Sequence, residues 1–150
     1  MGSEADELSL RMFRTFARFE YALKAVGFHS GDGKAEANWT KFANAFPDVL
    51  NDPISDELKE AVGYFDEKPP QKQVIVGGVL GWSPSPPRTK NKSDEILIYV
   101  RRVRNNLFHG GKFNGKWFEP QRSAELLRHS LTILDAFREA SEDVNAAYNS

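Results

Sequence analysis

Apolar side chains recur at intervals of three and four residues through much of this 150-residue chain, and that spacing favours helices. The pattern is clearest in residues 4–28, where one helical face collects Leu8, Met12, Phe16, Phe19 and Leu23. Gly27 follows the last of these positions and is typical of a helix cap, because glycine adopts a left-handed conformation at no steric cost. The sequence therefore predicts an amphipathic helix that ends near Gly27.

Four further segments carry the same signature, namely residues 35–46, 53–67, 93–109 and 120–148. Ser55 and Ser93 are candidate N-caps, because a serine hydroxyl at that position accepts a hydrogen bond from the first turn. Leucines line one side of the last segment. Five helices whose apolar stripes face inward predict an all-α fold, an antiparallel helical bundle.

Residues 68–92 interrupt the helical pattern. They hold five prolines and three glycines, which predicts a long connection before the segment that starts at Ser93. One short element is expected around residues 73–80. Within it, the sequence VIV is typical of a strand, but no second strand is evident to pair with it.

The composition is that of one globular domain spanning residues 1–150. Apolar residues make up 40% of the chain and eleven are phenylalanine, which is enough for one sizeable core. Cysteine is absent, and His29 and His129 have no partner at metal-ligand spacing, so neither a metal nor a cofactor is expected. The N-terminus lacks signal-peptide features and no segment is long enough to span a bilayer, which predicts a cytoplasmic protein without a membrane partner.

Charge is unevenly distributed along the chain. The net charge is −1, yet residues 88–116 contain eight lysines and arginines against Asp94 and Glu95, a local charge of +6. Such a run is often only a solvated face. It also fits a surface that binds an anion such as the RNA backbone.

The same basic segment contains the cluster "VRNNLFHGGK", residues 103–112. On a helical wheel Asn105 and His109 lie one above the other with Arg101 on the same flank, and Arg104 lies at the border with the apolar stripe. These four side chains can surround one small cleft. The two glycines after His109 allow the chain to leave without covering the imidazole.

The chemistry of this cluster suits a phosphodiester. An arginine presents a charged, planar fork to phosphate oxygens, and a histidine can accept or donate a proton near neutral pH. Asn105 can orient either group. The alternative is structural, because Arg, Asn and His side chains near a helix C-terminus often do no more than cap it.

The motif "RNNLFH" resembles the R-x(4–6)-H motif of the HEPN superfamily, including the asparagine directly after the arginine. The pair Phe19 and Glu20 in the first helix and the Leu-rich final helix are similar too. The resemblance implies a helical bundle that forms homodimers and acts as a metal-independent ribonuclease in toxin–antitoxin or phage-defence systems. It makes Arg104 and His109 the catalytic candidates, with Asn105 in support.

The predicted reaction is attack of the RNA 2′-hydroxyl on the adjacent phosphorus. Arg101, Lys112 and Lys116 are the expected contacts to RNA phosphates, and an antitoxin protein is a possible partner. Some members of the superfamily do not cleave RNA. The second hypothesis is therefore a non-catalytic module that binds RNA, a nucleotide or a partner protein through the same cleft.

Overall fold

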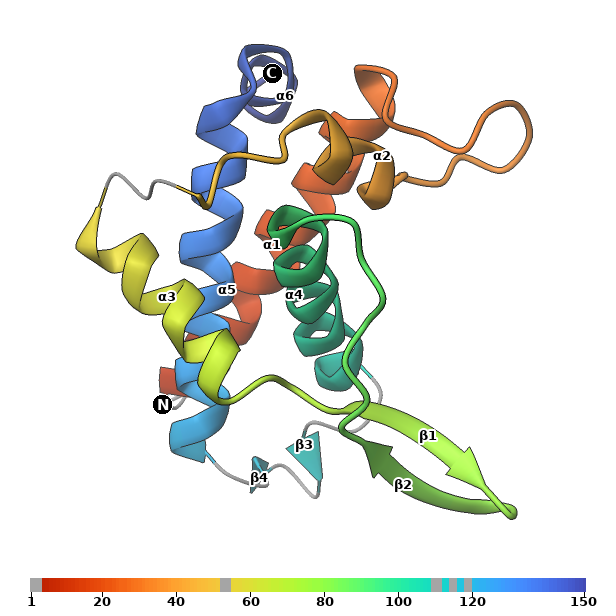
Figure 1. Cartoon of the computed structure of the whole chain (residues 1–150), viewed down its shortest axis with the longest axis vertical. Coiled ribbons are helices and arrows are strands. Elements are labelled where there is room, and N and C mark those ends of the chain that lie inside the picture. The colour runs from red at the N-terminus through yellow and green to blue at the C-terminus, as the bar shows by residue number, and fades with distance from the viewer. Residues whose placement is uncertain (1–3, 52–54, 109–111, 114–115, 118–119) are drawn as a thin grey trace.

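The computed structural model describes residues 4–51, 55–108, 112–113, 116–117 and 120–150. Its helices are α1 (Glu4–Ala25), α2 (Trp39–Ala45), α3 (Asp56–Glu67), α4 (Lys92–Phe108), α5 (Pro120–Ala140) and α6 (Glu142–Tyr148). Its strands are β1 (Lys72–Val76), β2 (Val79–Ser83), β3 (Lys112–Phe113) and β4 (Lys116–Trp117), paired as two antiparallel hairpins. The expectation of a mostly helical chain is confirmed, with α5 running between α3 and α1 and α4 beside them (Figure 1).

Helix α1 forms as its apolar spacing predicts. All five residues of the predicted stripe are buried, and Gly27 adopts a φ of 100° just beyond the helix end. Phe19 has no exposed surface and stacks on Trp39 of α2, with ring centroids 5.1 Å apart. Each large apolar side chain buried in this way stabilises the fold by about 1.5–3 kcal/mol.

An aromatic core joins the helices. Phe42 of α2 is fully buried and meets Phe19 edge to face at 5.7 Å and Phe137 of α5 at 5.9 Å. Edge-to-face contacts of this kind add to the free energy of area burial because the ring edge is electropositive and the ring face electronegative. These ring contacts join α1, α2 and α5.

The short element expected around residues 73–80 is present as a hairpin, and the expectation that its VIV strand has no partner is wrong. Strands β1 and β2 pair in register from Lys72 opposite Ser83 to Val76 opposite Val79. Gly77 and Gly78, with φ of 57° and 77°, form the two-residue turn between them. Two adjacent residues of positive φ match the twist of a hairpin, and only glycine adopts them freely. The strand expected to lack a partner thus pairs with the residues that follow the two glycines.

The prediction that Ser93 caps α4 is also wrong. Asn91 accepts a hydrogen bond from the backbone N–H of Asp94 at 2.8 Å, and its carbonyl accepts from Glu95. Ser93 is fully buried and donates to the carbonyl of Phe46 at 2.8 Å, which ties α4 to the end of α2. Asparagine and serine are both good caps, so sequence preference alone did not separate them.

The last predicted helix is divided in two at Ser141. Its hydroxyl accepts from the backbone N–H of Val144 at 3.2 Å and so caps α6, giving six helices in the described chain where five were expected. The N-cap predicted at Ser55 is confirmed, since its hydroxyl accepts from Leu58 at 3.1 Å. Within the described residues, no helix is both long and apolar enough to cross a membrane.

Candidate functional site

A cleft of about 440 Å³ lies where the start of β1 meets the outer flank of α4. It is lined by Lys72, Gln73, Ile98, Arg101, Arg102, Asn105 and Asn106. We call this the cationic cleft, because three of its residues are cations, three are amides and none of those seven is a carboxylate. The cationic and amide side chains that line it are of the kinds that donate hydrogen bonds to phosphate oxygens, which are negatively charged acceptors.

Side chains of α4 hold the chain before β1 in place by binding its backbone. Asn106 donates from Nδ2 to the carbonyl of Gln71 at 2.9 Å, and Arg102 donates to the carbonyl of Pro70 at 3.5 Å. The Arg102 guanidinium also lies 5.6 Å from the centre of the Tyr99 ring. These contacts fix the wall that carries Lys72 and Gln73.

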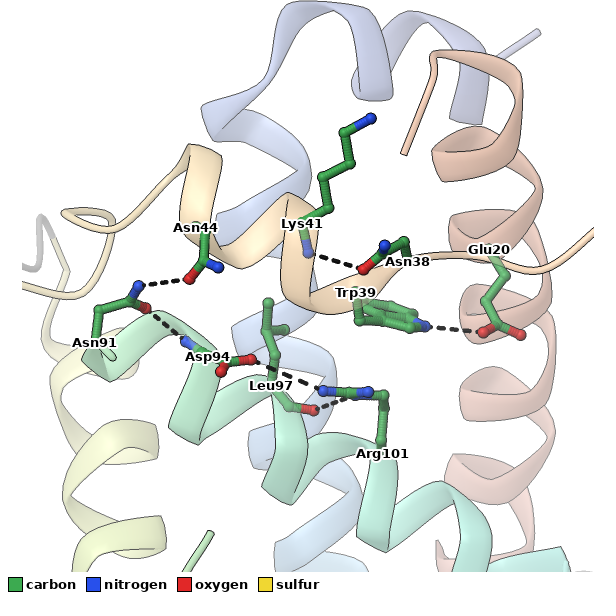
Figure 2. Close-up of polar contacts among 9 residues, drawn as sticks. All are labelled: Glu20, Asn38, Trp39, Lys41, Asn44, Asn91, Asp94, Leu97 and Arg101. Carbon is green, nitrogen blue, oxygen red and sulfur yellow. Dashed lines mark hydrogen bonds and ion pairs between the residues drawn. The ribbon is translucent and has the colours of Figure 1, made fainter. Parts of the chain in front are cut away.

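Arg101 lines the cleft but is also engaged on the helix itself. Its Nε donates to the carbonyl of Leu97 at 3.3 Å, and its guanidinium lies 4.0 Å from the carboxylate of Asp94 (Figure 2). Burial lowers the pKa of Arg101 below its usual value, while Asp94 and Glu20 act in the opposite direction. Because Asp94 pairs with it, the Arg101 guanidinium is less available to an anion in the cleft than an unpaired arginine would be.

Hydrogen bonds position the carboxylate of Glu20 and the backbone of Asp94, the two acidic residues around Arg101. Glu20 on α1 accepts from the indole of Trp39 at 2.8 Å (Figure 2). Asp94 is held at the start of α4 by Asn91, which donates in turn to Asn44 of α2 at 2.9 Å. The pair Phe19 and Glu20 thus serves the core and this polar network together: the ring packs inside and the carboxylate fixes Trp39.

Arg104 lies outside the set of residues that line the cationic cleft. Its guanidinium stacks 4.2 Å from the centre of the Phe108 ring and 5.3 Å from that of Phe16. It donates to Asn105 Oδ1 at 3.2 Å, while its buried Nε has no hydrogen-bond partner among the described atoms. The structure therefore brings Arg101 and Asn105 together in the cleft, as predicted, but places Arg104 at its margin against aromatic rings.

The prediction for His109 falls outside the described residues, as do those for the glycines at 110 and 111. Helix α4 ends at Phe108, directly before the histidine. Lys112 lies in β3 and Lys116 in β4, whose backbones are paired, but the description does not extend to their side chains. Their predicted phosphate contacts stay predictions.

Sequence reasoning missed Lys72, Gln73, Arg102 and Asn106 as members of the site. The first two were missed because the hairpin was not predicted. Arg102 and Asn106 are four residues apart, as are Arg101 and Asn105, so both pairs lie along the same side of α4. That spacing was the available signal. A wheel centred between the two pairs would have found the flank that forms the cleft.

Comparison of the chain with family models, curated proteins and solved structures found no match. Within the described part of the chain, no group of three or more histidine, aspartate or glutamate side chains is arranged to hold a metal ion. The geometry and charge of the cleft are therefore the features that bear on function.

Proposed function

We propose that the cationic cleft binds the phosphodiester backbone of RNA, and that the chain is a metal-independent endoribonuclease of HEPN type. The main support is the composition of the cleft. Lys72, Arg101 and Arg102 lie beside three amides, and none of the described lining residues is a carboxylate. Cations supply affinity for phosphate, and amides can hydrogen-bond both phosphate oxygens and ribose hydroxyls. A volume of about 440 Å³ is within the usual range for small-ligand sites.

In the proposed reaction the ribose 2′-hydroxyl attacks the adjacent phosphorus. His109 accepts the hydroxyl proton or donates a proton to the departing 5′-oxygen, so that the products are a 2′,3′-cyclic phosphate and a free 5′-hydroxyl. Arg104 stabilises the extra negative charge on the phosphorane from the margin of the cleft. Its hydrogen bond to Asn105, which lines the cleft, supports this placement.

The proposed active species is a homodimer, in which two copies of the motif meet at one composite site. Exposed apolar side chains on α1 and α4 offer a surface for a second copy: Phe13 of α1 lies against Phe108 at the end of α4, and Leu10 and Tyr21 are also exposed on α1. Phe13 and Phe108 are about half exposed and their ring centroids are 5.9 Å apart. Exposed apolar surface of this kind often marks a protein contact. A toxin or phage-defence role, with an antitoxin partner, follows from the HEPN resemblance.

A non-catalytic module is the second candidate, and one observation favours it. The Arg104 guanidinium lies over two phenylalanine rings and is not among the residues that line the cleft. An arginine held in this way can stabilise the helix end without reaching a phosphate. In that case the cleft would bind RNA without cleaving it.

The deciding experiment incubates single-stranded RNA with the protein in EDTA. The wild type should generate 2′,3′-cyclic phosphate ends, and His109→Ala should not. Lys72→Ala combined with Arg102→Ala should raise KM, because these cations bind substrate. Lys90→Ala is the matched control, an exposed cation of the same basic segment that lies outside the cleft lining.

Each outcome selects one candidate. If the wild type binds RNA but produces no new ends, the module is correct and the nuclease is not. If His109→Ala retains full activity, the proposed chemistry is wrong. If the Lys90 variant loses as much affinity as the double variant, binding is a general effect of charge and the cleft is not the site.

A further inference from the structure

The hairpin beside the cationic cleft carries an exposed tryptophan. Trp82 of β2 is 46% exposed and lies directly opposite Gln73 of β1, which lines the cleft. Side chains of directly opposed residues point to the same face of a hairpin, with Cβ atoms about 4.5–5.5 Å apart. The indole therefore lies on the Gln73 face of the hairpin, one strand away from the cleft.

The cleft beside this face and the indole on it together offer two features that single-stranded nucleic acids require, although Lys72 itself, one position from Gln73, points to the other face of the strand. The cleft offers Lys72 and Arg102 to the backbone, and no carboxylate of the described residues forms an ion pair with either. The indole offers a flat surface next to them. Proteins that bind single strands pair a cationic groove with aromatic rings on which bases stack.

We propose that Trp82 is a stacking site for an unpaired base of the RNA strand whose phosphates occupy the cationic cleft. The inference rests on the proposed RNA binding and makes it more specific, because a base inside a duplex has both faces covered by its neighbours. The cleft binds phosphates of any sequence. Stacking on Trp82 restricts the substrate to single-stranded segments, loops or ends.

The opposite face of the hairpin provides an internal control. Val79 is on the same strand as Trp82, is 68% exposed, and pairs with Val76 rather than with Gln73. Because Val79 and Trp82 are three positions apart in the strand, their side chains point to opposite faces. A contact specific to the Gln73 face should depend on Trp82 and not on Val79.

A second copy of this chain is the competing occupant of the hairpin. Ile75 and Leu80 lie on the same face as Trp82 and are 65% and 61% exposed, so the face is apolar as well as aromatic. The adjoining cations favour RNA, because a second copy of the hairpin would bring the same positive charges together. Light scattering distinguishes the two occupants.

The test measures binding of two oligonucleotides of equal length. Both carry 2′-O-methyl groups, which block cleavage, and one of them lacks its bases. Trp82→Leu should weaken binding of the strand with bases by roughly tenfold, the effect of losing one stacked base, and leave binding of the abasic strand unchanged. Trp82→Phe should restore part of the loss, and Val79→Ala should match the wild type.

Tryptophan fluorescence gives a second readout. Base stacking on Trp82 should quench the emission of the wild type, and that quench should shrink in Trp82→Phe. Trp39 is only 4% exposed and is shielded from a bound strand, and a Trp117→Phe background removes the third tryptophan of the chain. Circular dichroism melting of each variant establishes that the fold is retained.

Three outcomes overturn the inference. In the first, Trp82→Leu binds both strands as the wild type does; in the second, it loses equal affinity for both; in the third, it differs from the wild type in mass by light scattering. Failure of the proposed function looks different. There the wild type binds neither strand, or binds them without dependence on Lys72 and Arg102.

Discussion

The cationic cleft has a counterpart of opposite charge elsewhere in the molecule. A groove of about 550 Å³ lies between the chain that follows α2, the start of α3 and the C-terminal half of α5. We call it the acidic groove, because its lining includes four carboxylates: Asp48, Glu57, Asp135 and Glu139. None of the described residues that line it is a lysine or an arginine. The two cavities have similar volumes, so charge rather than size distinguishes them for a polyanion, which the first should attract and the second repel.

The two regions also differ in construction. The acidic groove includes buried Leu58 in its lining, and its walls are helices α3 and α5 and the chain that follows α2. The cationic cleft has one helical wall and one strand wall, tied together by side chains that bind backbone carbonyls. A net charge of −1 therefore hides two cavities of opposite charge.

The largest effect is expected from reversing charge in the cleft. Lys72→Glu combined with Arg102→Glu should lower the affinity for single-stranded RNA by about a hundredfold at low salt, because two attractive contacts become repulsive. Fluorescence anisotropy with a labelled oligonucleotide measures this. Glu57→Lys with Glu139→Lys is the matched reversal in the acidic groove and should change affinity by less than threefold. Equal effects from the two double variants would mean that overall charge governs binding.

Salt should separate the two cavities next. Each cation of the cleft that contacts a phosphate of a single strand contributes about 0.7 to the slope of log K against log salt concentration. Lys72→Ala with Arg102→Ala should therefore reduce the slope by about 1.4. Titrations at four salt concentrations give the slope. Neutral variants of Glu57 and Glu139 should leave it unchanged, and a shallower slope in those variants would place RNA at the acidic groove.

The tether between α4 and the chain before β1 should matter less than the charges. Asn106→Leu removes the hydrogen bond to the Gln71 carbonyl, which contributes about 0.5–1.5 kcal/mol to the free energy of unfolding. Chemical denaturation measures that loss. RNA affinity should fall severalfold because the wall with Lys72 is no longer held against α4. Asn149→Leu, at the far end of the chain, is the control for loss of an exposed amide.

Much of the helical frame was predictable because apolar spacing records which face each helix buries. The buried stripe of α1, the glycine cap at Gly27 and the cap at Ser55 follow from local rules. The VIV strand was recognised but its partner β2 was missed, because β2 is short, largely exposed and interrupted by Gly81, so no alternation of apolar and polar residues marked it. Local preference therefore found the frame and missed the strand wall of the cleft.

The candidate site was predictable only in part for a related reason. Helical spacing correctly placed Arg101 and Asn105 on one flank. It did not indicate that Arg104 would lie against Phe16, because Phe16 belongs to another helix, whereas the contact with Phe108, four residues later on α4, follows from the same spacing. Nor did it indicate that Asp94, about two turns earlier in α4, would engage Arg101.

The smallest expected effect concerns the packing of α3 against α5, the same pair of helices that walls the acidic groove. His129 of α5 packs on Tyr64 of α3 with ring centroids 4.7 Å apart, and burial lowers the pKa of His129. The folded state therefore binds a proton less readily than the unfolded state. Its stability should fall as the pH drops below the ordinary histidine pKa of about 6.5.

His129→Gln should reduce that pH dependence, because the substituted side chain does not titrate. Urea unfolding at pH 7.5 and pH 5.0 measures it, with His29→Gln as the control at an exposed histidine. None of the described residues that line the cationic cleft is a histidine, so in a His109→Ala background acidification to pH 5.0 should weaken the α3–α5 contact before it alters RNA binding. If RNA affinity fell in parallel with stability, the two regions would be coupled rather than independent.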